Sequence, residues 1–124
     1  MHPRLVPVES LAQLDSLLTP PAPRPVLIFK HSRSCGTSAQ ALDELVEHLD
    51  GPPNDVRYAI VTVQSHRDVS NAIARTLGVR HETPQALLIH DGRVVWSASH
   101  FRVTADAVRA AIGRLQSSEA VATR

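Results

Sequence analysis

Apolar and polar residues follow one another along the chain in two patterns, one typical of strands and one of helices. Residues 26–29 (VLIF) form a continuous apolar run, as in a strand covered on both faces of a parallel sheet. Residues 36–49 then repeat Leu and Val at helical spacing, and the sequence Gly51-Pro52-Pro53 closes this segment. The pattern therefore predicts a buried strand followed directly by an amphipathic helix.

The same order of strand and helix recurs further along the chain. Residues 56–63 are rich in side chains that favour strands, and residues 68–77 carry a helical apolar stripe. Gly78 follows that stripe close to the expected position of a helix C-cap. Two such strand–helix units, placed one after the other, favour a sheet with helices on both faces.

The C-terminal part predicts a hairpin and a last helix. Two apolar runs, 86–89 and 94–96, flank Asp91-Gly92, which is the strongest short hairpin signal that a sequence offers. These two strands should therefore be antiparallel. Thr104 is placed to cap a final helix, and the polar residues 116–124 are expected to form a flexible tail.

The N-terminal part adds a short strand and a short helix. Residues 5–8 give the weakest of the strand patterns, and residues 10–18 begin with Ser10-x-x-Gln13, which has the form of a capping box. The complete order predicts an α/β protein of one domain, residues 1–124, with a central mixed β-sheet flanked by helices. This is the element order of the thioredoxin-like fold.

Composition narrows the functions to consider. The 13 Lys and Arg nearly balance the 12 Asp and Glu, and no basic stripe with interleaved aromatic residues suggests a nucleic-acid partner. The seven histidines lack the spacing of a zinc site, so no metal is expected. No apolar run approaches the roughly 20 residues that span a membrane, and the first residues lack a secretory signal. With one cysteine in the chain, these features predict a cytoplasmic protein without a membrane partner.

The single cysteine, Cys35, lies between the predicted buried strand and the first turn of the following helix. Backbone N–H groups at a helix N-terminus stabilise an anion, and Lys30, His31 and Arg33 could add positive potential. A lone cysteine is otherwise more often a small buried hydrophobe. The polar residues around Cys35 (HSRSCGTSAQ) are not those that line a core, and this favours an exposed, reactive thiol.

Two further features bear on this thiol. Ser38 stands where a C-x-x-C motif carries its second cysteine, and its hydroxyl could equally bond the thiolate or merely stabilise the first helical turn. Thr83-Pro84 precedes a predicted strand, so the proline either punctuates the strand or is the cis-proline that lies beside the active cysteine in the thioredoxin fold. A single thiol can attack a disulfide but needs an outside thiol to release the product.

Several segments together resemble one protein family. They are FKHSRSCGTSAQALDEL at 29–45, VQSHRDVSNAIARTLGVRHETPQALLI at 63–89 and DGRVVWSASH at 91–100. These segments are similar to the monothiol bacilliredoxins, YtxJ-like thioredoxin-fold proteins of bacteria that use the thiol bacillithiol. The resemblance implies a thiol–disulfide oxidoreductase that removes bacillithiol from S-bacillithiolated cytosolic proteins. It also implies bacillithiol as the thiol cosubstrate and no tightly bound cofactor.

The resemblance assigns roles to particular residues. The active cysteine of the family matches Cys35, and the proline beside it matches Pro84. Family members carry C-P-I-S where this chain has C-G-T-S, so Gly36 implies a looser first helical turn and leaves the thiolate pKa open. The other residues expected to bind substrate are Thr83, His31, Ser38, Gly36 and Glu82.

Other matching residues have more than one interpretation. His81 and Gln85 flank the proline and could line a thiol-binding groove. Bacillithiol carries a malate group, whose carboxylates could pair with a guanidinium group of Arg33, Arg67 or Arg80. Residues that could serve only to fix the scaffold are Asn71, Trp96 and His100.

Two other functions fit the same cysteine. One is a non-catalytic redox sensor or binding module with the thioredoxin-like fold, in which Cys35 is modified but never turned over. The other is an iron–sulfur carrier, which needs a second thiol ligand from outside the chain. Turnover with excess free thiol separates the enzyme from the sensor.

Overall fold

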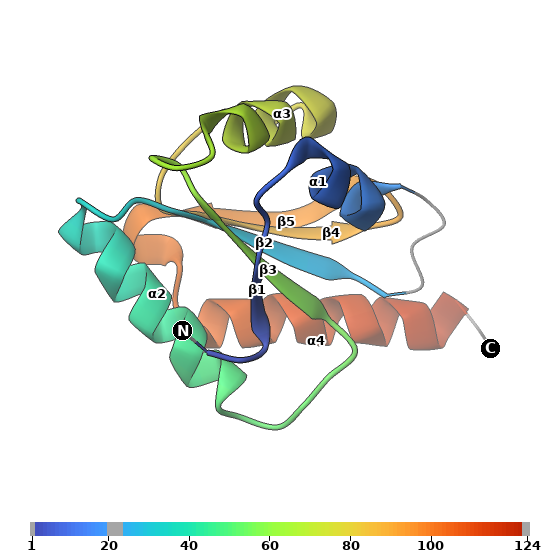
Figure 1. Cartoon of the computed structure of the whole chain (residues 1–124). Helices are drawn as coiled ribbons and strands as arrows, with labels where there is room; N and C mark the ends of the chain where they lie inside the picture. Colours follow the sequence, from blue (N-terminus) through green and yellow to red (C-terminus); the bar gives the residue numbers. More distant parts are fainter. Residues whose placement is uncertain (1, 20–23, 123–124) are drawn as a thin grey trace.

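The computed structural model describes residues 2–19 and 24–122 of the 124-residue chain. In this part of the chain a single sheet of five strands lies between two layers of helices (Figure 1). Helices α1 and α3 cover one face, and α2 and α4 cover the other. The elements in chain order are β1 (Leu5–Pro7), α1 (Leu11–Leu18), β2 (Val26–His31), α2 (Gly36–Leu49), β3 (Arg57–Thr62), α3 (Arg67–Leu77), β4 (Gln85–His90), β5 (Arg93–Ser99), the 3₁₀ helix η1 (His100–Arg102) and α4 (Ala105–Ala122).

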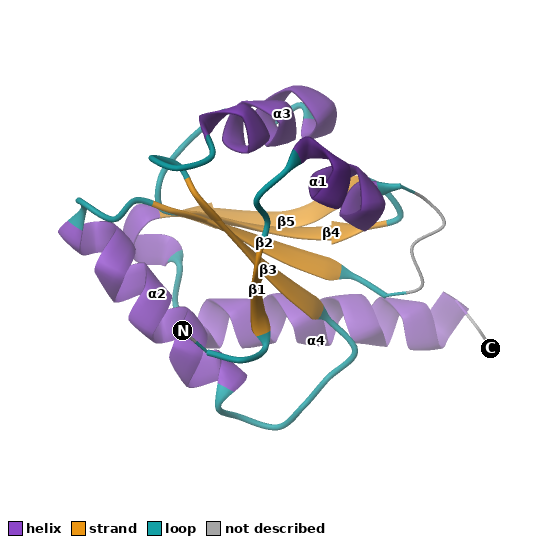
Figure 2. Ribbon diagram, in the orientation of Figure 1, coloured by secondary structure: helices purple, strands orange, loops and turns teal. Residues whose placement is uncertain are grey.

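The sheet is mixed, as the sequence pattern predicts. Its strand order is β1-β3-β2-β4-β5 (Figure 2). Strands β1 and β2 both pair with β3 in parallel, whereas β4 runs antiparallel to β2 and to β5. Strand β2 therefore lies at the centre, with Lys30 opposite Gln85 of β4. This central strand leads directly to the loop that carries Cys35.

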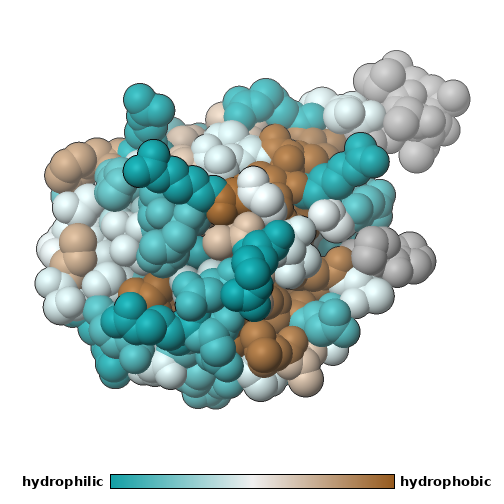
Figure 3. Space-filling view, turned by 90° about the horizontal axis from the view of Figure 1, so that it is seen from above, coloured by the Kyte–Doolittle hydropathy of each residue, from teal (hydrophilic) through white to brown (hydrophobic). Residues whose placement is uncertain are grey.

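The core consists of two apolar layers that share the central strand. Leu27 and Phe29 of β2 pack toward α2 and α4, whereas Val26 and Ile28 pack toward α1 and α3. All four side chains are buried, which confirms the expectation that the run 26–29 is covered on both faces. Seen from the side of α1 and α3, the surface is largely hydrophilic, with apolar residues between the polar ones (Figure 3).

Turns and caps confirm the local signals in the sequence. Ser10 Oγ accepts a hydrogen bond from the Gln13 N–H at 3.1 Å, and Gly78 ends α3 in the left-handed conformation at φ 64°. Asp91 and Gly92 have φ values of 52° and 77°, and two positive φ values are what a type I′ hairpin turn requires. Thr104 Oγ1 accepts from the Ala107 N–H at 3.1 Å, as expected of a helix cap.

The last helix and η1 differ from the sequence-based expectation. Residues 116–122 belong to α4, so the prediction of a tail from Gln116 is wrong up to Ala122, and residues 123–124 lie outside the described part. The segment contains no Gly or Pro to end the helix, and it includes Ala and Glu, which favour helix. Nothing in the sequence pattern predicts η1.

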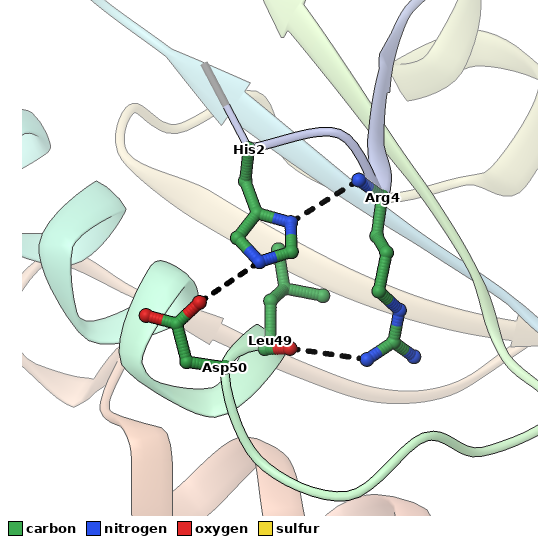
Figure 4. A network of polar contacts seen from close by, with 4 residues as sticks. All are labelled: His2, Arg4, Leu49 and Asp50. Carbon is green, nitrogen blue, oxygen red and sulfur yellow. Dashed lines mark hydrogen bonds and ion pairs between the residues drawn. The ribbon is translucent and has the colours of Figure 1, made fainter.

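Polar contacts fasten the N-terminal segment to the end of α2 (Figure 4). His2 Nε2 lies 3.0 Å from Asp50 Oδ1, and His2 Nδ1 accepts from the Arg4 backbone N–H at 3.1 Å. The Arg4 guanidinium donates to the Leu49 carbonyl oxygen at 3.1 Å and lies over the Tyr58 ring. These contacts hold the short edge strand β1, whose own sequence pattern is weak.

Among the described residues, no helix combines the length and the apolar character needed to cross a membrane.

Candidate active site

The thiol lies at the end of the central strand, where the chain turns into α2. Cys35 is the N-cap residue of α2, and its extended backbone (φ −118°, ψ 121°) directs the chain from the loop into the helix. Its side chain is partly exposed rather than buried. The interpretation of Cys35 as a buried hydrophobe is therefore wrong, because the polar residues 33–34 and 36–37 leave one side of the sulfur open.

The helix N-terminus favours the thiolate of Cys35. The backbone N–H of Ser38 makes the largest contribution to lowering the pKa of this thiol, and the N–H and hydroxyl of Thr37 lower it further. Partial desolvation opposes them by raising the pKa. The direction agrees with the general effect of unpaired N–H groups on an anion at this position. The thiol is thus more acidic than an ordinary cysteine.

The three nearby basic residues do not add to this effect. None of Lys30, His31 and Arg33 is among the causes of the lowered Cys35 pKa. Burial, followed by the charge of Arg33, lowers the pKa of His31, so this imidazole is mainly neutral at pH 7. The backbone of the first turn, rather than basic side chains, therefore determines the chemistry of the sulfur.

Ser38 has a different role from the two considered in the sequence. Its hydroxyl is fully buried, accepts a hydrogen bond from the Ser32 N–H at 2.9 Å, and lies 2.7 Å from His31 Nδ1. The backbone N–H of Ser38 acts on the sulfur, whereas its side chain binds the chain that leads into the site. Ser38 thus fastens the loop to the helix.

Gln64, in the loop between β3 and α3, anchors the same segment from the other side. Its Nε2 donates to Ser32 Oγ at 2.7 Å, and its Oε1 accepts from the Arg33 N–H at 3.2 Å. No local pattern points to this residue, because Gln64 lies 31 positions from Arg33 and only the fold brings the two together. The loop before Cys35 is therefore held at both faces.

Pro84 begins the strand next to β2, at the same end of the sheet as the thiol. The Thr83–Pro84 peptide bond is cis, and Pro84 is buried while Thr83 is partly exposed. The N–H of His100 donates to the Pro84 carbonyl oxygen at 3.0 Å, which brings η1 beside the proline. Helix α2 also packs against η1. The structure thus gathers the Cys35 helix, Pro84 and η1 in one region.

Glu82 places a carboxylate in the region formed by the Cys35 helix, Pro84 and η1. Its Oε2 accepts a short hydrogen bond from the Ser99 hydroxyl, and its Oε1 lies 3.8 Å from His100 Nε2. The Ser99 bond is the first cause of a lowered Glu82 pKa; partial burial opposes it, and the charges of His100, Arg80 and Arg102 lower the pKa further. Glu82 is therefore ionised at neutral pH.

Lys30, the only lysine of the chain, is completely buried beside this region. Its side chain lies on the α3 side of the sheet, where Nζ is 3.1 Å from His81 Nδ1. Burial lowers the pKa of Lys30 from 10.5 to about 8. The pKa of His81 is also lowered, first by burial and then by Lys30 and Arg67, while Glu82 opposes this. His81 thus accepts from Lys30 and holds the segment that precedes Pro84.

Some of the remaining residues singled out in the sequence lie close to the site, and others do not. The charge of Arg80 lowers the pKa of Glu82, and the charge of Arg67 lowers the pKa of His81. Arg33 is exposed in the loop before Cys35. Gln85 is buried and donates to the Arg80 carbonyl oxygen at 3.0 Å. Asn71 is exposed, Trp96 packs partly buried against the core, and His100 is part of the site region itself.

Gly36 occupies the first position of α2 in an ordinary helical conformation. A Cβ at this position meets no atom within 4 Å, and the preceding residue is extended, as the residue before a proline must be. Gly36→Pro is therefore expected to raise the free energy of unfolding by about 0.5–1 kcal/mol, because proline restricts the unfolded chain. The Gly36 N–H is not among the groups that lower the Cys35 pKa, so that pKa should change little.

Chemical denaturation measures the first effect of Gly36→Pro, and ultraviolet titration of the thiolate measures the second. Gly113→Pro, inside α4, is the matched control and should destabilise the protein. A loss of stability in Gly36→Pro would contradict the open, helical geometry of this position.

No three His, Cys, Asp or Glu side chains gather as a metal site requires, in the part of the chain that the structure describes.

Comparisons with known proteins identify the family. The family described as Monothiol bacilliredoxin BrxC matches residues 6–108. One similar solved structure, described as a candidate oxidoreductase with a thioredoxin fold, is 29% identical with a TM-score of 0.76, over 86% of this chain and 92% of that one.

Two thioredoxins share the fold at lower identity. Thioredoxin from Fasciola hepatica is 20% identical with a TM-score of 0.69, over 88% of this chain and 97% of its own. Thioredoxin f2 from Chlamydomonas reinhardtii is 19% identical with a TM-score of 0.69, over 90% of this chain and 96% of its own. The fold is the thioredoxin fold, and the chain belongs to the monothiol bacilliredoxin family.

Proposed function

We propose that this protein is a monothiol thiol–disulfide oxidoreductase that removes bacillithiol from S-bacillithiolated cytosolic proteins. The family and the fold support a thiol redox function. The observation that carries the proposal is Cys35 itself, a partly exposed thiol whose pKa is lowered by the first turn of α2. Serine at position 38 leaves this motif with one thiol only.

The reaction consists of two balanced disulfide exchanges. In the first, the Cys35 thiolate attacks the bacillithiol sulfur of the mixed disulfide; the S–S bond breaks, and the substrate cysteine leaves as a thiolate. In the second, the thiolate of free bacillithiol attacks the same sulfur on Cys35, forming bacillithiol disulfide and returning Cys35 as a thiolate. No electron is gained or lost overall, because one disulfide replaces another.

The chain's own residues would prepare each exchange. The N–H groups of Thr37 and Ser38 stabilise the Cys35 thiolate before attack and again when it leaves in the second step. Ser38 and Gln64 hold the loop that positions the sulfur. In this proposal Thr83 and Pro84, at the same end of the sheet, guide the substrate chain past the thiol.

Steady-state turnover tests this proposal. The protein is incubated with a bacillithiolated model protein, and release of the substrate thiol is followed as free bacillithiol is increased. We expect one equivalent of release without free bacillithiol, because the product stays on Cys35, and continuous release with it. Cys35→Ser should release no more thiol than free bacillithiol releases without the protein.

Each other outcome assigns a different function. Release that stops at one equivalent despite excess bacillithiol would make the protein a sensor rather than an enzyme. Release by Cys35→Ser at the rate of the wild type would remove Cys35 from the reaction. A protein that cycles with any small thiol at the same rate would retain the chemistry but lose its specificity for bacillithiol.

A further inference from the structure

A polar groove adjoins Pro84 on the β5 side of the site. It has a volume of about 520 Å³ and is lined by Glu82, residues 97–99 of β5 and residues 100–102 of η1. The backbone contact from His100 to Pro84 joins this groove to the proline. Because α2 begins after Cys35 and packs against η1, the groove lies against the element that carries the thiol.

The groove is lined by one carboxylate, Glu82, one guanidinium group, Arg102, and the imidazole of His100. Glu82 is bonded to Ser99 and faces His100, and the charges of Arg80 and Arg102 also reach it. Arg102 is exposed and makes no side-chain hydrogen bond or ion pair with any described residue. Its guanidinium group is therefore available to pair with a carboxylate of a ligand.

The wall formed by η1 is fixed and presents an aromatic ring. His100 has a φ of 55°, in the left-handed region that non-glycine residues seldom adopt, and its N–H is held by Pro84. Phe101, the next residue, is 69% exposed although it is a large apolar side chain. An exposed ring beside fixed polar groups is typical of a small-molecule site.

We propose that this groove binds the free bacillithiol that attacks in the second exchange, with its malate carboxylates at Arg102. Bacillithiol consists of cysteine, glucosamine and malate, so it carries an amine, a hydroxylated ring and two carboxylates. In this arrangement the Glu82 carboxylate pairs with the amine of bacillithiol, and the Phe101 ring packs against the face of the sugar. Arg102 pairs with the malate carboxylates. This inference rests on the proposed function and names the residue that selects a dicarboxylate thiol.

The arginines suggested by the sequence are less well placed than Arg102. Arg33 lines a different cavity, with residues of β1, β3 and the loop after β3, and Arg67 acts on His81. Arg80 reaches Glu82 but does not line the groove. The sequence did not single out Arg102, because only the course of the chain through η1 brings it beside Glu82.

The test compares two thiols in the second exchange alone. Wild-type protein carrying bacillithiol on Cys35 is mixed with free bacillithiol or with free cysteine, and the rate constant of release is measured for each. Arg102→Gln is expected to lower the rate constant with bacillithiol about 10-fold, the loss typical of one charged hydrogen-bonded contact. The rate constant with cysteine, which lacks the malate, should stay unchanged.

Three variants complete the experiment. Arg102→Lys keeps the charge but not the two parallel donors of the guanidinium group. Its rate constant with bacillithiol should therefore fall less than that of Arg102→Gln. Arg75→Gln, on the exposed side of α3, should match the wild type with both thiols. An unchanged ratio of the two rate constants in Arg102→Gln, or a loss in Arg33→Gln instead, would overturn the groove assignment. Failure of the wild type to accept bacillithiol on Cys35 would overturn the proposed function instead.

Discussion

Replacing Ser38 by alanine is expected to lower the free energy of unfolding by about 2–3 kcal/mol. The buried hydroxyl accepts from the Ser32 N–H and contacts Nδ1 of the half-buried His31, so its loss leaves the buried Ser32 N–H without a partner and removes one contact of His31. Each buried polar group that loses its partner costs roughly 1–3 kcal/mol. The backbone N–H of residue 38 stays, so the Cys35 pKa should remain lowered. Urea denaturation and thiolate titration of the same sample measure both quantities.

The matched control is Ser16→Ala on α1. The Ser16 hydroxyl is exposed and bonds only to the Ala12 carbonyl oxygen of its own helix. Its loss should change the free energy of unfolding by no more than about 0.5 kcal/mol. Equal effects of the two substitutions would contradict the role of Ser38 as the fastening of the cysteine loop.

Lys30→Met is expected to remove a strong dependence of stability on pH. Burial lowers the pKa of Lys30 to about 8, against 10.5 as the ordinary value, so above pH 8 the unfolded chain holds this proton more tightly than the native protein. Stability therefore rises with pH in this window, by roughly 2 kcal/mol between pH 8 and 9.5. Below pH 8 both states are protonated, and the buried ammonium lowers stability by a constant amount.

The measurement is best made on the Cys35→Ser background. The lowered Cys35 pKa gives stability the same direction of change with pH, and this substitution removes it. Denaturation curves at several pH values should then show a free energy of unfolding that rises with pH in the protein that keeps Lys30. In Lys30→Met the free energy of unfolding should stay constant over the same pH range. Because the chain has one lysine, a single ε-amine NMR signal reports its pKa directly. A signal that titrates near 10.5 would contradict the burial of this amine.

Local pattern predicted most of the elements because local physics determines them. The run 26–29 is apolar on both faces because both helical layers cover it, and Asp91-Gly92 forms the turn because both residues tolerate positive φ. The polar composition after Gln116 predicts a tail, but α4 continues to Ala122 because the segment holds no Gly or Pro that would end a helix.

The sequence predicts only part of the site, because the rest depends on contacts between segments that are distant along the chain. The position of Cys35 before a helix and of Pro84 before a strand follows from sequence. The hydrogen bond from Gln64 to Ser32 and the placement of Arg102 beside Glu82 do not follow from the sequence, because each joins segments that only the sheet brings together. The helix N-terminus that the sequence indicated does lower the Cys35 pKa, whereas the positive potential that Lys30, His31 and Arg33 could have added is not among the causes.

Mass spectrometry of a single turnover tests the central claim most directly. The protein is mixed with one equivalent of a bacillithiolated model protein, without free thiol, and the intact masses are recorded before and after bacillithiol is added. We predict that the mass of one bacillithiol moves to this chain, maps to the peptide that contains Cys35, and disappears when free bacillithiol is added. An unchanged mass, or an adduct that excess bacillithiol does not remove, would contradict a catalytic cycle through Cys35.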